Sequence, residues 1–186
     1  MTPEGFTDLL LALTCLLLAW HLRRRSAGLQ VALLVIGMAA GLGVARFEGA
    51  DWALGPHRFA VIVAGTAALP LLAWSLRWPG SLPATQPRAA CITIVFGGAL
   101  GVILAGLSGI TFWPLLCQAM ALAGLVAAAW HRRHPRLVVG VLLLLGAAGV
   151  QVSDGVFAGL PATALLHLLL AAGLVAATTA NDGARH

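Results

Sequence analysis

The sequence predicts an all-α polytopic membrane bundle of seven transmembrane helices, with the N-terminus outside and the C-terminus inside. Of the 186 residues, 60% are hydrophobic and only 9% are charged, whereas a soluble domain carries about 25% charged residues. The apolar residues form long uncharged runs, and most of the arginines gather on alternate connections between these runs. A chain with so little charge cannot cover a water-exposed surface, so lipid is its expected solvent.

The seven expected spans form a single integral membrane domain over residues 1–186. They cover about 6–22, 27–46, 59–76, 89–107, 110–130, 137–153 and 160–178. The first helix is expected to start at Thr2-Pro3-Glu4, because a capping hydroxyl, a proline at the first helical position and an acid in the first turn are typical of a helix start. It ends at Arg23-Arg24-Arg25.

Prolines and glycines mark the breaks within and between the later spans. Pro70 predicts a kink or an unsatisfied carbonyl inside the third span. The 42 residues 89–130 carry no charge, and as one helix they would reach about 63 Å, roughly twice a bilayer core. They must therefore fold back on themselves. The sequence Gly106-Leu107-Ser108-Gly109 is the expected hairpin, and Pro114 lies early in the helix that follows.

The basic residues orient the bundle, and all eleven of them are arginines. The two on the predicted outer side are Arg46 and Arg58, and nine lie on the other side: Arg23, Arg24, Arg25, Arg77, Arg88, Arg132, Arg133, Arg136 and Arg185. This bias predicts a multi-pass protein of the bacterial inner membrane with its C-terminus inside. The net charge of +5 therefore reflects topology and does not indicate nucleic-acid binding. The absence of lysine excludes a retinal Schiff base.

Glycine pairs predict where helices approach each other. Gly37/Gly41 and Gly97/Gly101 are GxxxG pairs, which allow close backbone contact in lipid. These faces are expected to pack within the bundle, against a second copy of the chain, or against partner subunits of a membrane complex.

Polar residues gather on the predicted outer side, and any acid–base or metal chemistry is expected there. An ionisable residue inside a span is costly and is a functional hypothesis by default. His167 is such a residue, about 9 Å into the seventh helix. The candidate polar pocket consists of Asp8, Glu48, Gln151, Asp154 and His167.

Three of these residues form a candidate metal set. His167, Glu48 and Asp154 would supply mixed oxygen and nitrogen ligands of the kind that zinc or another divalent metal accepts. Haem with His57 and His167 as axial ligands is an alternative. His57 follows Gly-Pro at the start of a helix and is otherwise expected to be solvated.

The stretch Gly41-Leu42-Gly43-Val44-Ala45-Arg46-Phe47-Glu48 resembles the second-helix motif of the alkaline ceramidase and progestin/adiponectin receptor superfamily of seven-helix membrane hydrolases. That motif reads Gly-x-Gly-Ser-x-x-Phe-His, and its Ser and His belong to a zinc site. The resemblance implies seven helices and a metal-binding histidine on the seventh, where His167 lies. Val44 and Glu48 replace the motif's Ser and His, and Ala171 stands where a second histidine is expected. Thr7-Asp8-Leu9-Leu10 is also similar to the start of short bacterial seven-helix proteins.

Two functions follow, with a third that has less support. The first is a diverged ceramidase-like protein whose outer-facing pocket binds a membrane lipid or small amphiphile, either with metal-dependent hydrolysis or without it. The alternative is a non-enzymatic accessory or assembly subunit of a larger membrane complex. A transporter is the third, suggested by Pro70 and Pro114 within spans. A site requires Glu48, Asp154 and His167 to converge, whereas an interaction protein does not.

Overall fold

The structure is a computed structural model, and it describes residues 1–151, 156–157 and 160–180. Within these ranges the chain is helical apart from connections and a small antiparallel hairpin, β1 (Val156–Phe157) and β2 (Leu160–Pro161). The α-helices are α1 (Pro3–Leu22), α2 (Ala27–Phe47), α3 (Leu54–Val63), α4 (Leu69–Arg77), α5 (Leu82–Thr85), α6 (Pro87–Gly101), α7 (Trp113–Arg132), α8 (Pro135–Gln151) and α9 (Ala162–Thr179). One 3₁₀ turn, η1 (Asp51–Ala53), and two π-helical segments, η2 (Ala64–Ala68) and η3 (Val102–Leu107), adjoin them.

Several of these helices are long and apolar enough to cross a membrane. In the described ranges they are Pro3–Leu22, Ala27–Phe47, Asp51–Arg77, Pro87–Leu107, Trp113–Arg132 and Ala162–Thr179, and α8 is a shorter apolar helix of 17 residues. All lie close to the expected runs. The largest difference is at the third, which begins at Asp51 instead of residue 59, because a helix continues past its apolar part into the interface, where charged residues are tolerated.

The helix starts follow the capping signals in the sequence. Thr2 caps α1, with its Oγ1 accepting a hydrogen bond from the Gly5 amide at 3.0 Å, and Pro3 and Glu4 occupy the first turn. Ser26 caps α2 by accepting from the Leu29 amide at 3.3 Å. Each cap satisfies a backbone donor that would otherwise have no intrahelical partner.

The third span changes helix type just before Pro70. A proline cannot offer an N–H to the carbonyl four residues earlier, which here belongs to Thr66. The chain adopts the π-helical segment η2 at this point, and the Leu69 amide bonds the Ala64 carbonyl five residues back. The expected disturbance at Pro70 is thus a wider turn. The expected hairpin is also present, since the chain breaks between η3 and α7 and Gly109 has a φ of +70°.

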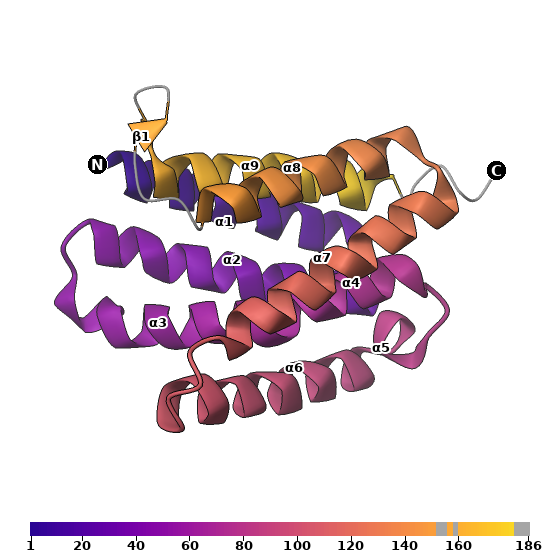
Figure 1. Ribbon diagram of the computed structural model, residues 1–186, viewed down its shortest axis with the longest axis horizontal. Helices are drawn as coiled ribbons and strands as arrows, with labels where there is room; N and C mark the ends of the chain where they lie inside the picture. Colours follow the sequence, from indigo (N-terminus) through magenta and orange to yellow (C-terminus); the bar gives the residue numbers. More distant parts are fainter. Residues whose placement is uncertain (152–155, 158–159, 181–186) are drawn as a thin grey trace.

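The helices pack as a bundle around α1, α2, α4 and α9 (Figure 1). α1 packs along α2 and α9, α8 packs along α9, and α4 packs along α7. α6 lies at one side of the bundle, against α2, α3 and η2. α8 and α9 approach closely at Gly140, where an added Cβ would lie 2.6 Å from the backbone nitrogen of Ala177. Small residues allow such contacts, which drive helix association in lipid.

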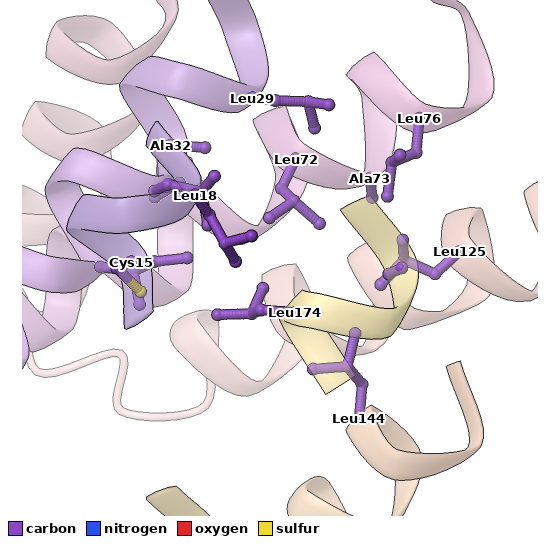
Figure 2. Close-up of a cluster of buried hydrophobic side chains, with 14 of the residues drawn as sticks. Cys15, Leu18, Leu29, Ala32, Leu72, Ala73, Leu76, Leu125, Leu144 and Leu174 are labelled. Atoms are coloured by element: carbon purple, nitrogen blue, oxygen red, sulfur yellow. The ribbon is translucent and has the colours of Figure 1, made fainter. Parts of the chain in front are cut away.

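A hydrophobic cluster joins these helices in the middle of the bundle (Figure 2). The figure labels Cys15, Leu18, Leu29, Ala32, Leu72, Ala73, Leu76, Leu125, Leu144 and Leu174, which come from α1, α2, α4, α7, α8 and α9. All ten are buried. The packing of this cluster determines which helices are neighbours. It thereby brings polar residues from separate helices together near one end of the bundle.

The two ends of the bundle differ in charge. The acid end holds the start of α1 and the α2–α3 connection, and its described acids are Glu4, Asp8, Glu48 and Asp51. The arginine end holds the α1–α2, α4–α6 and α7–α8 connections, with Arg23, Arg24, Arg25, Arg77, Arg88, Arg132, Arg133 and Arg136. The described arginines at the acid end are Arg46 and Arg58.

Candidate polar cavity

A cavity of about 170 Å³ lies inside the bundle, extending from the acid end toward the hydrophobic cluster. Its lining comes from α1, α2, α3, η2, α4, α7, α8 and α9. The polar residues among those that line it are Asp8, His57, Gln118, Gln151 and His167. The structure therefore brings three of the five predicted pocket residues to one cavity, and it adds His57 and Gln118.

Asp8 and His167 meet across the α1–α9 contact. His167 Nδ1 lies 3.2 Å from Asp8 Oδ1 and 3.5 Å from the Thr7 hydroxyl. The Thr7 hydroxyl already donates to the Glu4 carbonyl at 3.0 Å, so it can only accept from the imidazole. With Asp8 as a carboxylate, both neighbours of Nδ1 are acceptors. Nδ1 therefore carries the hydrogen, and Nε2 is left as an acceptor.

Asp8 is deeply buried, with 1% of its surface exposed. Its second oxygen, Oδ2, has no hydrogen-bond partner among the described residues. Buried polar atoms are almost always paired, so a single unpaired oxygen at a cavity wall requires an explanation. Arg46 lies near enough for its charge to act on Asp8.

The glycine at position 43 makes room for this carboxylate. A Cβ built on Gly43 would lie 2.7 Å from Asp8 Cγ, closer still to Oδ2, and 3.1 Å from His57 Cε1. Any larger residue would displace one of the two polar side chains. By contrast, a Cβ on Gly41 would meet no atom within 4 Å. Of the glycines in the motif-like stretch, Gly43 is thus the one that the site requires.

The expectation that His57 is solvated is wrong, because the structure buries this side chain against α2. Its exposed fraction is 9%, and Nδ1 lies 3.1 Å from the Ala39 carbonyl. A carbonyl oxygen only accepts, so Nδ1 donates and Nε2 remains an acceptor. The Phe47 ring packs edge-on at 6.3 Å. The α2–α3 hairpin turns this residue inward, although it lies only one turn from the helix start.

The two glutamines complete the polar wall from α7 and α8. Gln118 packs opposite Gly65 of the π-helical segment η2, where an added Cβ would lie 2.7 Å from its Nε2. Gln151 is the last residue of α8. Gln118 could have been found in the sequence as the one polar amide within the uncharged run 89–130, since a polar residue inside a span is itself a signal. His57 was named from the sequence only as an alternative haem ligand, because it lies near the start of a helix and not inside an expected span.

The cavity is polar at one end and apolar at the other. Three helices repeat this order: Gln118 is followed inward by Leu125, Gln151 by Leu144, and His167 by Leu174. In each case the leucine is seven residues farther from the acid end, or about 10 Å along the helix. The cavity thus has one polar end and one apolar end, which would match the head group and the tail of an amphiphilic molecule.

Two predicted site residues lie elsewhere. Glu48 is not among the residues lining the cavity. Instead, its Oε1 accepts a hydrogen bond from the Thr2 amide at 2.8 Å, and its Oε2 lies 3.8 Å from the terminal amine of Met1. Glu48 thus anchors the start of α1 at the surface, where its charge is solvated. Asp154 lies outside the described residues.

The proposed metal set is therefore not assembled in the described part of the chain, since Glu48 and His167 serve different contacts. Within those residues, no three His, Cys, Asp or Glu side chains form a group that could hold a metal ion. Divalent metal binding and haem binding stay predictions from the sequence.

Fold and site together define a helical bundle of membrane type with an internal amphiphilic cavity. Residues 4–185 match the model of a family of unknown function, DUF6962, and the chain belongs to this family. The search of curated proteins and the search of solved structures each found no match.

Proposed function

We propose that this protein is a multi-pass membrane protein that binds an amphiphile, with a hydrogen-bond-donating head group at Asp8, His57 and His167. The apolar part of the ligand would lie along the leucines toward the middle of the bundle. The observation that carries this proposal is the polarity of the cavity, which runs in one direction on α7, α8 and α9.

The hydrogen-bond inventory of the polar end favours a ligand that donates. Asp8 Oδ2 is an unpaired acceptor. The contacts of His57 and His167 use Nδ1 as the donor and leave Nε2 as an acceptor on each ring. Three acceptors at one end of a cavity match an ammonium group, which has three donors and no acceptor. A long-chain primary amine is the simplest molecule with this head and an apolar tail.

The size of the cavity limits the ligand. A dry cavity of about 150 Å³ in a soluble protein accommodates benzene, and this one has about 170 Å³. The site therefore has space for the head group's first carbons and a short alkyl segment. The rest of a longer chain would extend between helices into lipid.

We further propose that all seven apolar segments span the bacterial inner membrane with the acid end outside. The support is the distribution of arginine between the two ends, because positively charged connections remain on the cytoplasmic side. In this orientation the cavity is reached from the outer leaflet. Reporter fusions to the α2–α3 and α7–α8 connections would test the orientation, which requires opposite locations for the two.

Binding is best tested with two amphiphiles that share a chain and differ in charge. The protein in lipid nanodiscs would be titrated with decylamine and with decyl sulfate, and ligand binding followed by the rise in the free energy of unfolding. A ligand at 100 times its Kd stabilises by about 2.7 kcal/mol. We expect the amine to stabilise the protein, and Asp8→Asn to weaken amine binding at least tenfold, since removing one partner of a buried charge pair costs about 2–5 kcal/mol.

The matched control is Glu48→Gln, which removes an acid at the same end that does not line the cavity. It leaves general partitioning of the amine into the bilayer unchanged, and it should bind decylamine like the wild type. Equal responses to amine and sulfate, or equal losses in Asp8→Asn and Glu48→Gln, would contradict the proposal.

The contact between Asp8 and His167 favours a second candidate, hydrolysis of a bound amphiphile. A carboxylate that orients an imidazole is the usual arrangement of a general base, and His167 Nε2 would take a proton from water. Hydrolysis of acyl esters or amides should then be lost in His167→Gln. Elemental analysis of the same preparations tests metal dependence: stoichiometric zinc that disappears in His167→Ala would support it. An absence of amine binding, hydrolysis and metal would leave the accessory-subunit function.

A further inference from the structure

Two grooves run along α7 at the arginine end, one on each side of Trp130. The first has a volume of about 740 Å³, extends from Ala119 to His131, and is bordered by Arg77 of α4. The second, of about 440 Å³, lies between α7 and α8 and is bordered by Arg133. Trp130 lines both grooves, and 79% of its surface is exposed. The tryptophan therefore forms a ridge between two channels.

Both grooves have the chemistry of a lipid acyl chain, and the first also has its length. The walls are apolar, with Val126 and Leu145 lining both grooves. Between Ala119 and His131, α7 rises about 18 Å, slightly more than half of a hydrocarbon core of about 30 Å. The first groove is thus as long as one leaflet is deep, whereas the second follows α7 only from Val126 to Arg133, about 10 Å. Together they offer places for one whole phospholipid chain and for the part of the second chain nearest the head group.

The basic groups lie at the same end of both grooves. Arg77 and His131 border the first and Arg133 borders the second. The charges of Arg77 and Arg132 are close enough to act on each other. The acids that the structure describes all lie at the opposite end of the bundle: Glu4, Asp8, Glu48 and Asp51. The arginine end therefore presents a positive potential beside apolar channels.

The backbone at Arg133 indicates that its side chain has a role. This residue ends α7 in the left-handed conformation, with φ 49° and ψ 27°. Glycine is the usual residue at such a helix end because it adopts this conformation without steric cost. Among the described non-glycine residues, Arg133 is the one with a positive φ. A guanidinium occupies this position although glycine would adopt the backbone conformation at lower steric cost.

We propose that this surface binds an anionic phospholipid, with the phosphate between Arg77 and Arg133 and one acyl chain in each groove beside Trp130. A lipid fits better than a protein helix, because two apolar grooves on either side of one exposed tryptophan match two chains that share one head group. An anionic lipid fits better than a zwitterionic one, because the head group meets guanidinium groups and no described acid.

Native mass spectrometry of the delipidated full-length protein tests this directly. The protein would be mixed with equimolar phosphatidylglycerol and phosphatidylcholine that carry the same acyl chains. We expect phosphatidylglycerol adducts to dominate. Each arginine near a membrane surface is worth about fivefold in affinity for anionic lipid, so Arg77→Gln with Arg133→Gly should weaken phosphatidylglycerol binding about 25-fold and leave phosphatidylcholine binding unchanged.

Arg133→Gly separates lipid binding from folding. Glycine adopts the left-handed backbone conformation of this position without steric cost, so this variant alone should keep the unfolding transition of the wild type. It should still lose about fivefold in affinity for phosphatidylglycerol. The matched control for this single change is Arg58→Gln, which removes an exposed arginine at the acid end that does not line the cavity and should change neither adduct. Equal binding of the two lipids, a preference that survives the Arg77/Arg133 changes, or an equal loss in the control would overturn the proposal. So would a lipid-free dimer that Trp130→Ala dissociates.

Discussion

Replacing Gly43 by alanine should break the contact between Asp8 and His167. The new Cβ would lie 2.7 Å from Asp8 Cγ. To reach an ordinary contact of 3.4 Å, Cγ must retreat by 0.7 Å (3.4 − 2.7), and Oδ2, which is nearer, must retreat farther. His167 Nδ1 is already 3.2 Å from Asp8 Oδ1, at the long end of hydrogen-bond geometry. A displacement of this size therefore disrupts the hydrogen bond between Asp8 and His167. His57 Cε1 lies 3.1 Å from the new atom and limits movement on its side.

The expected cost follows from a matched comparison with Gly41→Ala on the same helix. Both substitutions gain the same helix propensity, up to about 1 kcal/mol, and a Cβ on Gly41 meets nothing within 4 Å. The difference between the variants therefore isolates the clash. Overpacking costs about 1–3 kcal/mol, and losing a hydrogen bond to a charged group costs about 1.5–3 kcal/mol. Because both costs apply to Gly43→Ala, we expect it to be about 3 kcal/mol less stable than Gly41→Ala.

The assay is the free energy of unfolding in mixed micelles with increasing SDS, followed by tryptophan fluorescence. Repeating both substitutions in an Asp8→Ala background completes a double-mutant cycle, in which the penalty at Gly43 should largely disappear because the clashing carboxylate is gone. If Gly43→Ala and Gly41→Ala unfold alike, or if the penalty persists without Asp8, the packing described for this site is incorrect.

Two further predictions concern helix packing and the chain start. Gly140→Ala should destabilise the protein by about 1–3 kcal/mol, because the new Cβ meets the backbone nitrogen of Ala177 at 2.6 Å and a backbone atom cannot turn aside. Gly149→Ala, on the same helix with nothing within 4 Å, should not be destabilising, and equal unfolding free energies would argue against close α8–α9 packing. Glu48→Gln should cost less than about 1 kcal/mol, because its bond to the Thr2 amide is exposed to solvent. A larger loss would place Glu48 in a buried site.

Hydropathy and capping signals were sufficient to predict the long apolar helices, but the short helix α5 lies between the expected spans and was not predicted. The first helix begins where Thr2-Pro3-Glu4 predicts it, and the uncharged run 89–130 folds back at Gly109. These features are local, because length and apolar composition decide whether a segment can cross a bilayer. The π-helical segments were not predicted, although Pro70 indicated where the regular helix would be disturbed.

The site was only partly predictable because it depends on which helices are neighbours. Asp8 and His167 were both expected on the outer side, yet only the packing of α1 against α9 brings them to 3.2 Å. Glu48 lies on the expected side of the bundle and carries a carboxylate that could bind a metal, but it follows the end of α2 and its side chain turns toward Thr2. The position of a residue in the sequence predicts its depth in the membrane, but it does not predict the direction in which its side chain points. His57 shows the same limit, since its burial depends on the angle of α3.

The π-helical segment η2 has a consequence for the angle of α3. Each residue of an α-helix advances the chain by about 100° around its axis, and a π turn contains one extra residue. Everything before η2 is therefore rotated by about that angle relative to an unbroken α-helix. His57 lies seven residues before Ala64, roughly 10 Å away. Deleting one residue of η2 would shorten the span very little, but it would swing His57 away from Ala39 and out of the cavity. The presence of His57 at the polar end of the cavity thus depends on the number of residues in η2, about 10 Å away along the helix.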